Sequence, residues 1–305
     1  MATTRTRART IEKLNTMQLE LDYPASARLE LLRGETVVVK YGGHALSSGG
    51  LPGFAADVAY LVRAGVRVVV VHGGGPEISE EMQRKGIVPK FVSGLRVTDA
   101  ASLKIAEEVL SGRVNPEIVT ALEKAGCKAV GISGRDGAFL RAHYKKGRVK
   151  DASGRESEVD LGYVGEIDGI NSRLLALLQG GGYVPVIAPI GVTASGQHLN
   201  INADSVAGAI AGALKAASCV FLTDVVGILR DAKDPNSLIR ALRFREAVAL
   251  MESGAVTGGM IPKVGACLDA LSSGAREARI ADGREPRALL NALLPAEGVG
   301  SALSP

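Results

Sequence analysis

The chain has 305 residues, 46% of them hydrophobic and 22% charged, which is typical of a folded protein with one large or two ordinary domains. A net charge of +4, no Trp and 4% aromatic residues argue against a single-stranded nucleic-acid binder and suit an acidic small molecule as partner. The three cysteines are widely spaced, which argues against a disulfide framework, and the four histidines lack ligand spacing, which argues against a metal cluster. No apolar run approaches the ~20 residues of a membrane span, which argues against a membrane protein. Together these features predict a cytoplasmic protein.

The N-terminal segment is expected to lie outside the main core. Residues 1–10 are basic and are not followed by the apolar stretch of a signal peptide, so we interpret them as a tail. Residues 8–33 carry a helical pattern that Pro24 interrupts, which predicts two short helical pieces.

From Thr36 onward, β-branched runs alternate with helical patterns, which predicts an α/β fold around a mostly parallel sheet. Residues 137–165 are polar and turn-rich and predict a hairpin, and a domain boundary is expected near residue 190. Continuous apolar runs, typical of strands buried on both faces, predict strands at residues 36–41, 66–73, 127–133, 182–190, 218–225 and 275–283. Helical spacing predicts helices at residues 51–65, 76–86, 99–112, 115–126 and 170–181, and a further helix near residue 204.

Two of the predicted strands end in glycine runs. The stretch TVVVKYGGHAL (36–46) places Lys40 and two glycines at the end of one strand, and VRVVVVHGGGPEIS (66–79) ends the next strand in three glycines before a helix. Glycine lets backbone N–H groups approach an anion, and a helix N-terminus favours negative charge. Ligands in open α/β sheets bind beyond the carboxyl ends of the strands. We therefore expect one anion site from both runs, although either run alone is also compatible with a simple tight turn.

This anion site differs from the common nucleotide motifs. Neither run has the form G-x-x-x-x-G-K-[ST], and the dinucleotide fingerprint G-x-G-x-x-G is missing, which disfavours a nicotinamide-dependent dehydrogenase. A further lysine, Lys263, follows a glycine pair in GGMIPKV. The residues alone leave open whether it extends to solvent or binds phosphate.

Two other polar stretches also have more than one interpretation. Asn200, Asn202 and Asp204 stand where a helix begins, so Asn202 or Asp204 is a helix cap, part of a site, or both. Arg96 precedes a helix that we expect Thr98 to cap, and it is either a fork for a carboxylate or a solvated side chain.

Together these stretches resemble the amino acid kinase family, and within it the members that phosphorylate N-acetyl-L-glutamate. The resemblance implies a three-layer αβα fold with an N-terminal extension (1–35), an amino-acid-substrate lobe (36–190) and an ATP lobe (191–305). The stretches run in the family's order and cover most of the chain: VVVKYGGHAL, VVVVHGGGPEIS, GLRVTD, DLGYVGEIDGIN, LNINAD, FLTDVVGIL and GGMIPKV.

The activity that the resemblance implies is transfer of the γ-phosphoryl group of ATP to the side-chain carboxylate of N-acetyl-L-glutamate. The product would be an acyl phosphate, N-acetylglutamyl 5-phosphate, formed in the second step of arginine biosynthesis. Mg²⁺ would be carried mainly by the nucleotide, without a metal site in the protein.

The resemblance also implies roles for individual residues. Lys40 and Lys263 would be the cations on the transferring phosphoryl group, and Asp204 would hold them in place. Arg96 and Asn200 would bind the amino-acid end of the substrate. The phosphoryl group and the reacting carboxylate would contact the amides of Gly43, Gly74 and Gly75. The nucleotide would contact Thr223, Asp224, Val225, Val226, Gly227, Ile228, Leu229, Ala255, Val256 and Thr257.

The segment before the first strand resembles the extra helix of arginine-inhibited members of the family. This implies a homodimer or a hexamer and makes arginine a candidate feedback inhibitor, and a trimeric nitrogen-signal protein is a further candidate partner. Two alternatives stay open: a sister kinase for another carboxylate, such as aspartate or a carrier-bound aminoadipate derivative, and a catalytically silent arginine-sensing subunit. The presence of Lys40, Asp204 and Lys263 disfavours the silent subunit.

Overall fold

The computed structural model describes residues 23–43, 49–150, 156–231, 233–234, 236–254, 256, 260–295 and 298–305. The predicted tail, the first predicted helical piece and two residues expected to contact the nucleotide, Ala255 and Thr257, lie outside the described residues.

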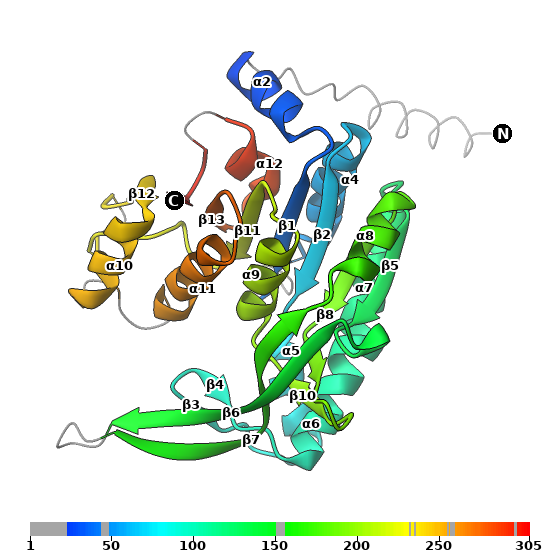
Figure 1. Cartoon of the computed structure of the whole chain (residues 1–305), viewed down its shortest axis with the longest axis vertical. Helices are drawn as coiled ribbons and strands as arrows, with labels where there is room; N and C mark the ends of the chain where they lie inside the picture. Colours follow the sequence, from blue (N-terminus) through cyan, green and yellow to red (C-terminus); the bar gives the residue numbers. More distant parts are fainter. Residues whose placement is uncertain are drawn as a thin grey trace, which may run out of the picture.

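The fold is built on a central sheet of eight strands, which confirms the predicted α/β class (Figure 1). Neighbouring strands are parallel except β13 and β14, which run antiparallel. All six strands predicted from apolar runs belong to this sheet, whereas two short strands at one end of it were not predicted. From edge to edge the strands are β12 (Ala241–Arg243), β14 (Ser301–Ser304), β13 (Ala278–Asp282), β11 (Ser218–Thr223), β1 (Thr36–Tyr41), β2 (Arg67–His72), β8 (Val184–Ala188) and β5 (Ala129–Ser133).

Helices cover both faces of the sheet, which gives the expected three-layer αβα arrangement (Figure 1). Successive side chains of a strand point to opposite faces, so Val37 and Val39 belong to one core and Val38 belongs to the other. The first core contains residues of α4 (Leu51–Arg63), α5 (Gly75–Arg84), α6 (Ala100–Val109), α7 (Asn115–Lys124) and α12 (Ala288–Leu293). The second core contains residues of α8 (Arg173–Gly180), α9 (Ala203–Ala213), α10 (Phe244–Glu252) and α11 (Met260–Ser272).

The predicted hairpin is confirmed and forms the lower part of the molecule in Figure 1. Strands β6 (Leu140–Lys150) and β7 (Glu156–Ile170) pair antiparallel. They close into a small four-stranded sheet with β9 (Ile190–Val192) and β10 (His198–Asn200). A two-stranded ribbon of β3 (Phe91–Val92) and β4 (Leu95–Arg96) lies beside it. The single turn η2 (Asp136–Ala138) leads from β5 into the hairpin.

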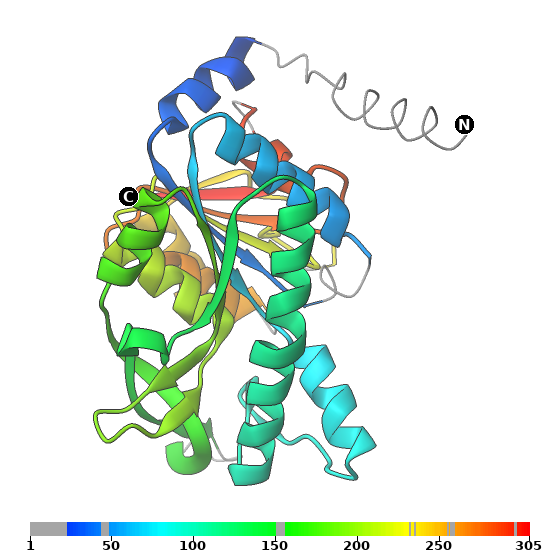
Figure 2. The ribbon, with the colours of Figure 1, turned by 90° about the vertical axis from the view of Figure 1, so that its right-hand side faces the viewer.

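Helices α6 and α7 differ from the sequence-based prediction because no break separates them. A π turn, η1 (Leu110–Val114), joins them, and Figure 2 shows the three segments as one long helix. The Asn115 N–H donates to the Leu110 carbonyl, five residues back. Pro116 follows at the start of α7, and a proline ring lacks an N–H and crowds the preceding turn. The wider turn accommodates the proline without ending the helix.

Helix α2 (Tyr23–Leu32) precedes β1 and projects from one end of the molecule (Figure 1). Leu32 is buried in the first core, Arg28 forms an ion pair with Glu277 beside β13, and Leu31 is 73% exposed. Among the helices within the described ranges, none has both the length and the apolar character that crossing a bilayer would need.

Helices α9 and α11 pack unusually close together on the second face of the sheet. A Cβ atom at Gly208 would lie 3.0 Å from the Ala266 carbonyl oxygen, and one at Gly212 would lie 2.2 Å from the Ser273 Cβ. The residue numbers rise together along the two helices, since Gly208 meets Ala266 and Gly212 meets Ser273. The helices therefore run parallel and begin at the same edge of the sheet.

Gly212→Ala should destabilise the protein. The added methyl group has no room against Ser273, and overpacking of this kind costs about 1–3 kcal/mol, more than the ~0.5–1 kcal/mol that alanine gains over glycine inside a helix. Equilibrium urea unfolding measures the change. The matched control is Gly265→Ala on α11, where a Cβ would meet nothing within 4 Å and the change should be neutral or slightly stabilising. Equal unfolding free energies for the two variants would contradict the packing argument.

Asp57 is a buried carboxyl group on α4. It is 4% exposed, and its Oδ2 accepts a hydrogen bond of 3.2 Å from the Leu289 N–H at the start of α12. Burial raises the pKa of Asp57 to about 6. The folded state therefore holds this proton more tightly than the unfolded chain, in which an aspartate has a pKa of about 3.9.

The stability that Asp57 contributes should be fully present below pH ~4 and should be lost as the pH rises through about 6. Asp57→Asn cannot titrate, so its unfolding free energy relative to the native chain should improve by about 2–3 kcal/mol between pH 4 and pH 7. Urea unfolding of both proteins across this range measures the difference. A difference that does not change with pH would show that Asp57 titrates normally.

Candidate active site

The two glycine runs meet at the carboxyl edge of the central sheet. Strands β1 and β2 are parallel neighbours in which Tyr41 pairs with His72, so the runs leave the sheet side by side. The Gly73 N–H donates to the Tyr41 carbonyl over 2.9 Å. A Cβ atom at Gly42 would lie 2.9 Å from the Gly73 nitrogen, closer than real contacts allow. Glycine is therefore required at position 42 for the two runs to touch.

Lys40 points to the face of the sheet that α9 covers, because it follows Val38 in the alternation of β1. Its Nζ lies 3.0 Å from Asp204 Oδ1, and the two residues are only 8% and 9% exposed. A buried cation is costly to leave without a partner, so each charge stabilises the other. The ion pair connects the middle of the sheet to the first turn of α9.

Asn202 caps α9 and leaves Asp204 available for Lys40. Its Oδ1 accepts the N–H groups of Asp204 and Ser205 over 2.8 and 3.2 Å. Of the two roles that the sequence left open, Asn202 is therefore the helix cap and Asp204 is the partner of Lys40. The negative charge of Asp204 lies in the first turn of the helix, where the helix dipole also favours it.

A cavity of about 260 Å³ opens next to this ion pair, and it brings together seven of the predicted site residues. They come from the ends of β1 and β2, from β4, from β10 and from the first turn of α9. The seven are Lys40, Gly43, Gly74, Gly75, Arg96, Asn200 and Asp204.

Arg96 is held firmly at the wall of this cavity. Its Nη2 donates to the Gly75 carbonyl over 2.9 Å and to Ser79 Oγ over 2.8 Å, and the guanidinium lies 4.8 Å from the centre of the Phe91 ring. The residue is 8% exposed, and burial lowers its pKa. These contacts exclude a freely solvated arginine.

The expected helix cap next to Arg96 was wrong. Asp99 caps α6 by accepting the Ser102 N–H over 2.7 Å, whereas Thr98 Oγ1 donates to the Arg96 carbonyl over 3.0 Å. Thr98 is fully buried beneath β7 and therefore cannot stand at the open end of the helix. Asn200 Nδ2 contacts Thr98 Oγ1 at 3.5 Å, which connects the arginine strand to β10.

Of the residues expected to contact the nucleotide, Thr223 ends β11 and residues 224–229 follow it, next to β1 at the same edge of the sheet. Thr223 Oγ1 donates to Asp224 Oδ1 over 3.0 Å. Ile228 is fully buried, and its N–H donates to Ser301 Oγ over 2.8 Å, while Val226 is 44% exposed. Val256 is 5% exposed and packs in the second core. Buried Ile228 and Val256 therefore offer little side-chain surface to a ligand.

Lys263 lies in the first turns of α11 and is partly exposed. Within the described part of the chain, it is not among the residues that line the cavity of Lys40 and Asp204. The parallel packing of α9 and α11 nevertheless puts the starts of both helices at one edge, so Lys263 and Asp204 lie at corresponding ends of neighbouring helices.

Two buried residues, His72 and Asn115, lie behind the second glycine run and were not singled out from the sequence. His72 Nδ1 is 2.8 Å from the Gly73 carbonyl oxygen, and His72 Nε2 is 3.1 Å from Asn115 Nδ2. Burial lowers the pKa of His72 to about 4, so the ring is neutral at pH 7. The available signal was a polar ring at the end of an otherwise apolar strand, directly before the glycines.

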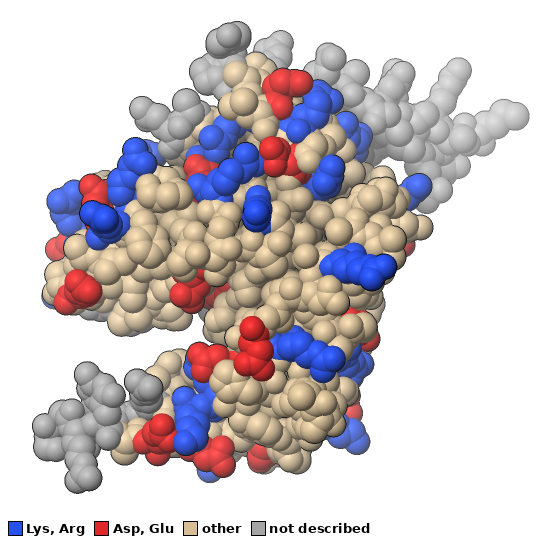
Figure 3. All heavy atoms as spheres, in the orientation of Figure 1, with Lys and Arg blue, Asp and Glu red and all other residues tan. Residues whose placement is uncertain are grey.

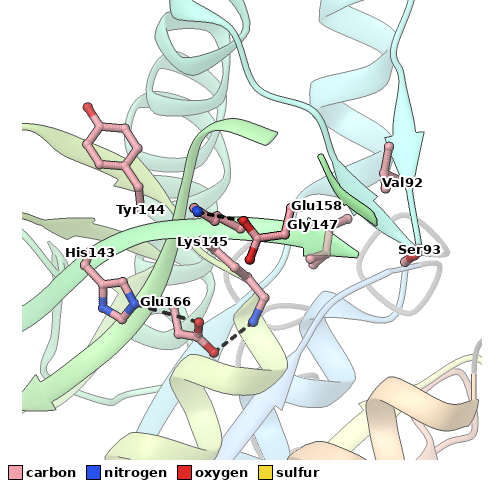
Figure 4. A pocket seen from close by; sticks show the side chains of 10 residues that line it. Val92, Ser93, His143, Tyr144, Lys145, Gly147, Glu158 and Glu166 are labelled. Carbon is pink, nitrogen blue, oxygen red and sulfur yellow. Dashed lines mark hydrogen bonds and ion pairs between the residues drawn. The ribbon is translucent and has the colours of Figure 1, made fainter. Parts of the chain in front are cut away.

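A second cavity, of about 660 Å³, lies where the hairpin faces the β3–β4 ribbon (Figure 4). Lys145 Nζ is 3.1 Å from Glu166 Oε1 within it. Asp269 lies on α11, and burial is the main reason that its pKa is raised. Figure 3 shows a deep hollow between the hairpin and the helices above it.

Comparison with known proteins agrees with this geometry. Residues 35–282 match the model of the amino acid kinase family. The acetylglutamate kinase of Geotalea uraniireducens is 44% identical over 295 residues, which cover 96% of this chain and 98% of that protein. The acetylglutamate kinase of Nitratidesulfovibrio vulgaris is 48% identical over 276 residues, or 90% of this chain and 89% of that protein.

A solved structure shares the same fold. It is the N-acetylglutamate synthase of Neisseria gonorrhoeae complexed with coenzyme A and N-acetyl-glutamate, with a TM-score of 0.78 and 26% identity. The match covers 92% of this chain but only 62% of the synthase. Since the family model spans most of the chain and the kinases match it almost from end to end, the chain belongs to the amino acid kinase family.

Proposed function

We infer that the chain transfers the γ-phosphoryl group of ATP to the side-chain carboxylate of N-acetyl-L-glutamate and so makes N-acetylglutamyl 5-phosphate for arginine biosynthesis. Relatives named acetylglutamate kinase, 44% and 48% identical over nearly the whole chain, support this activity. The structural observation that carries it is the buried pair of Lys40 and Asp204, which stands 3.0 Å apart beside the glycine runs in a cavity that Arg96 also lines.

The cavity suits a small molecule with two carboxylates. Lys40 and Arg96 supply two buried cations to its lining, and Gly43, Gly74 and Gly75 supply backbone. We assign Arg96 to the α-carboxylate, since its contacts with Gly75, Ser79 and Met82 occupy three of its five N–H groups and leave two, on Nε and Nη1, for the substrate. Asn200 would bind at the same amino-acid end, and the glycine amides would contact the reacting carboxylate.

The chemistry requires positioning and charge stabilisation more than proton transfer. A glutamate side chain has a pKa of about 4.3, so at pH 7 the nucleophile is already ionised and no general base is required. Lys40 and Lys263 would neutralise the charge that spreads over the transferring phosphoryl group. Asp204 would keep Lys40 in place and would not take up a proton.

The chain uses ATP as phosphoryl donor, as its family does. We place the nucleotide at the loop that follows β11, residues 223–229, and at residues 255–257, which makes residues 191–305 the ATP lobe and residues 36–190 the substrate lobe. Within the described residues, no three His, Cys, Asp or Glu side chains are grouped so that they could hold a metal ion. Mg²⁺ would therefore be bound mainly by the nucleotide phosphates and water.

The substrate and the catalytic cations are tested together by trapping the acyl phosphate as a hydroxamate. We expect ATP-dependent product with N-acetyl-L-glutamate and far less with L-glutamate, L-aspartate or N-acetyl-L-aspartate. Lys40→Ala and Lys263→Ala should each lower kcat by about 10²–10³-fold, because each removes one charge from the transition state. The matched control is Lys85→Ala, which removes a half-exposed lysine from the end of α5 and should leave kcat unchanged.

Three results would change the assignment. Product with aspartate alone would point to a sister kinase, and no product with any of the four would point to a carrier-bound substrate or a silent subunit. Full activity of Lys263→Ala would show that Lys263 has no role in catalysis, and the proposed reaction would still stand.

We also propose that the chain assembles as a homodimer or hexamer and that arginine inhibits it through the N-terminal helix. Two observations support this: α2 projects from the molecule with Leu31 largely exposed, and the N-acetylglutamate synthase of Neisseria gonorrhoeae has also been solved with L-arginine. A trimeric nitrogen-signal protein stays a candidate partner.

Millimolar arginine should inhibit the full chain, and deletion of residues 21–33 should remove the inhibition while leaving activity without arginine largely intact. Initial rates at increasing arginine concentration measure this, and sedimentation of the same samples reports the oligomer. An uninhibited full chain at millimolar arginine would refute the proposal.

A further inference from the structure

The side chain of His72 is fixed in one tautomer by its neighbours. Asn115 Nδ2 donates to the Val186 carbonyl over 2.9 Å, and because a carbonyl can only accept, this atom must be the amide nitrogen. The same nitrogen lies 3.1 Å from His72 Nε2, which must therefore be the acceptor. The proton of the neutral ring is then on Nδ1, and it is donated to the Gly73 carbonyl over 2.8 Å.

This hydrogen bond sets the direction of the peptide group between Gly73 and Gly74. The peptide is trans and planar, so the Gly73 C=O and the Gly74 N–H point in opposite directions. The other side of Gly73 is fixed as well, since its own N–H donates to the Tyr41 carbonyl. Once the hydrogen bond from His72 fixes the Gly73 carbonyl, the Gly74 N–H can point in one direction only, away from His72.

That direction is toward the cavity. Val68 and Val70 of β2 belong to the first core, so His72 continues their alternation toward the face that carries α7 and Asn115. Lys40 and Asp204 lie on the opposite face, beneath α9. A Gly73 carbonyl drawn toward His72 thus aims the Gly74 N–H at the side where the ion pair and the cavity lie.

The π turn places Leu110 and Asn115 close to the end of β2 and the glycine run that follows it. Leu110 lines the cavity, and its Cδ2 lies 2.6 Å from the position that a Cβ on Gly74 would take. Asn115, whose N–H closes the π turn onto Leu110, reaches His72 from behind. One wide helical turn therefore packs on Gly74 through Leu110 and reaches His72 through Asn115.

We propose that His72 and Asn115 are positioning residues that orient the Gly74 N–H as a preformed hydrogen-bond donor for the reacting oxygen in phosphoryl transfer. Neither side chain contacts the substrate, and both act through the Gly73 carbonyl. The inference rests on the proposed function for the identity of the oxygen, but not for the orientation of the peptide. A donor that is aligned before the substrate arrives stabilises the transition state without reorganisation at the moment of reaction.

The test combines a kinetic comparison with a direct view of the proton. His72→Leu should lower kcat for N-acetyl-L-glutamate by about 10²-fold, the scale of one lost oxyanion donor, with a much smaller change in KM. His72→Asn can place an amide N–H where Nδ1 stands and should recover at least tenfold of that loss. Asn115→Leu, which removes the hydrogen bond to Nε2 and so loosens the ring, should lie between the two. The matched control is Val69→Ala, another buried substitution in β2, which should lower the melting temperature without the loss of kcat.

The tautomer is read from the ¹⁵N chemical shifts of histidine-labelled protein, with His72→Leu assigning the signal. We expect a neutral ring with the proton on Nδ1 in the native chain, and the same tautomer in Asn115→Leu, because the Gly73 carbonyl can only accept. A proton on Nε2 in the native chain, or a kcat of His72→Leu equal to that of Val69→Ala, would overturn the proposal. An Nδ1 proton in a native chain that makes no hydroxamate would instead overturn the proposed function and leave the orientation of the peptide standing.

Discussion

The ion pair between Lys40 and Asp204 is the interaction on which the arrangement of the site depends. It joins the central strand of the sheet to the first turn of α9 in a place where neither charge is tolerated alone. Removal of one partner from such a pair typically costs about 3–5 kcal/mol, since the other charge stays buried. The pair therefore holds the first turn of α9 against the sheet. It thereby also positions Asn202 and Asn200, which form part of the cavity wall.

The glycine runs and the charged residues could be found from the sequence because their signals are local. A lysine within an apolar strand, glycines at strand ends and a cap before α9 all follow from short-range rules. The alternation of β1 even determines that Lys40 faces the second core, once α9 is placed there. The α/β class and the hairpin followed in the same way, from strand composition and from turn-rich polar residues, whereas the three-layer αβα arrangement was implied by the family resemblance.

The features that the sequence did not reveal depend on contacts between distant segments. Asn115 reaches His72 across 43 positions, and only the packing of α7 on β2 brings them together. Thr98 was taken for a cap because burial beneath β7 is invisible in the local pattern, and Asp99 took the role instead. Ile228 shows the same limit, since its N–H donates to Ser301 Oγ, 73 positions away.

The close packing of α9 and α11 has a mechanical consequence. At Gly208 and Gly212 the two helices pack so closely that no space for a side chain is left between them. Protein interiors packed at this density transmit strain. Helix α11 begins beside the segment assigned to the nucleotide, whereas α9 begins with the carboxylate that holds Lys40. A displacement of α11 relative to the sheet would therefore have to carry α9 with it, and with α9 the Asp204 carboxylate that holds Lys40.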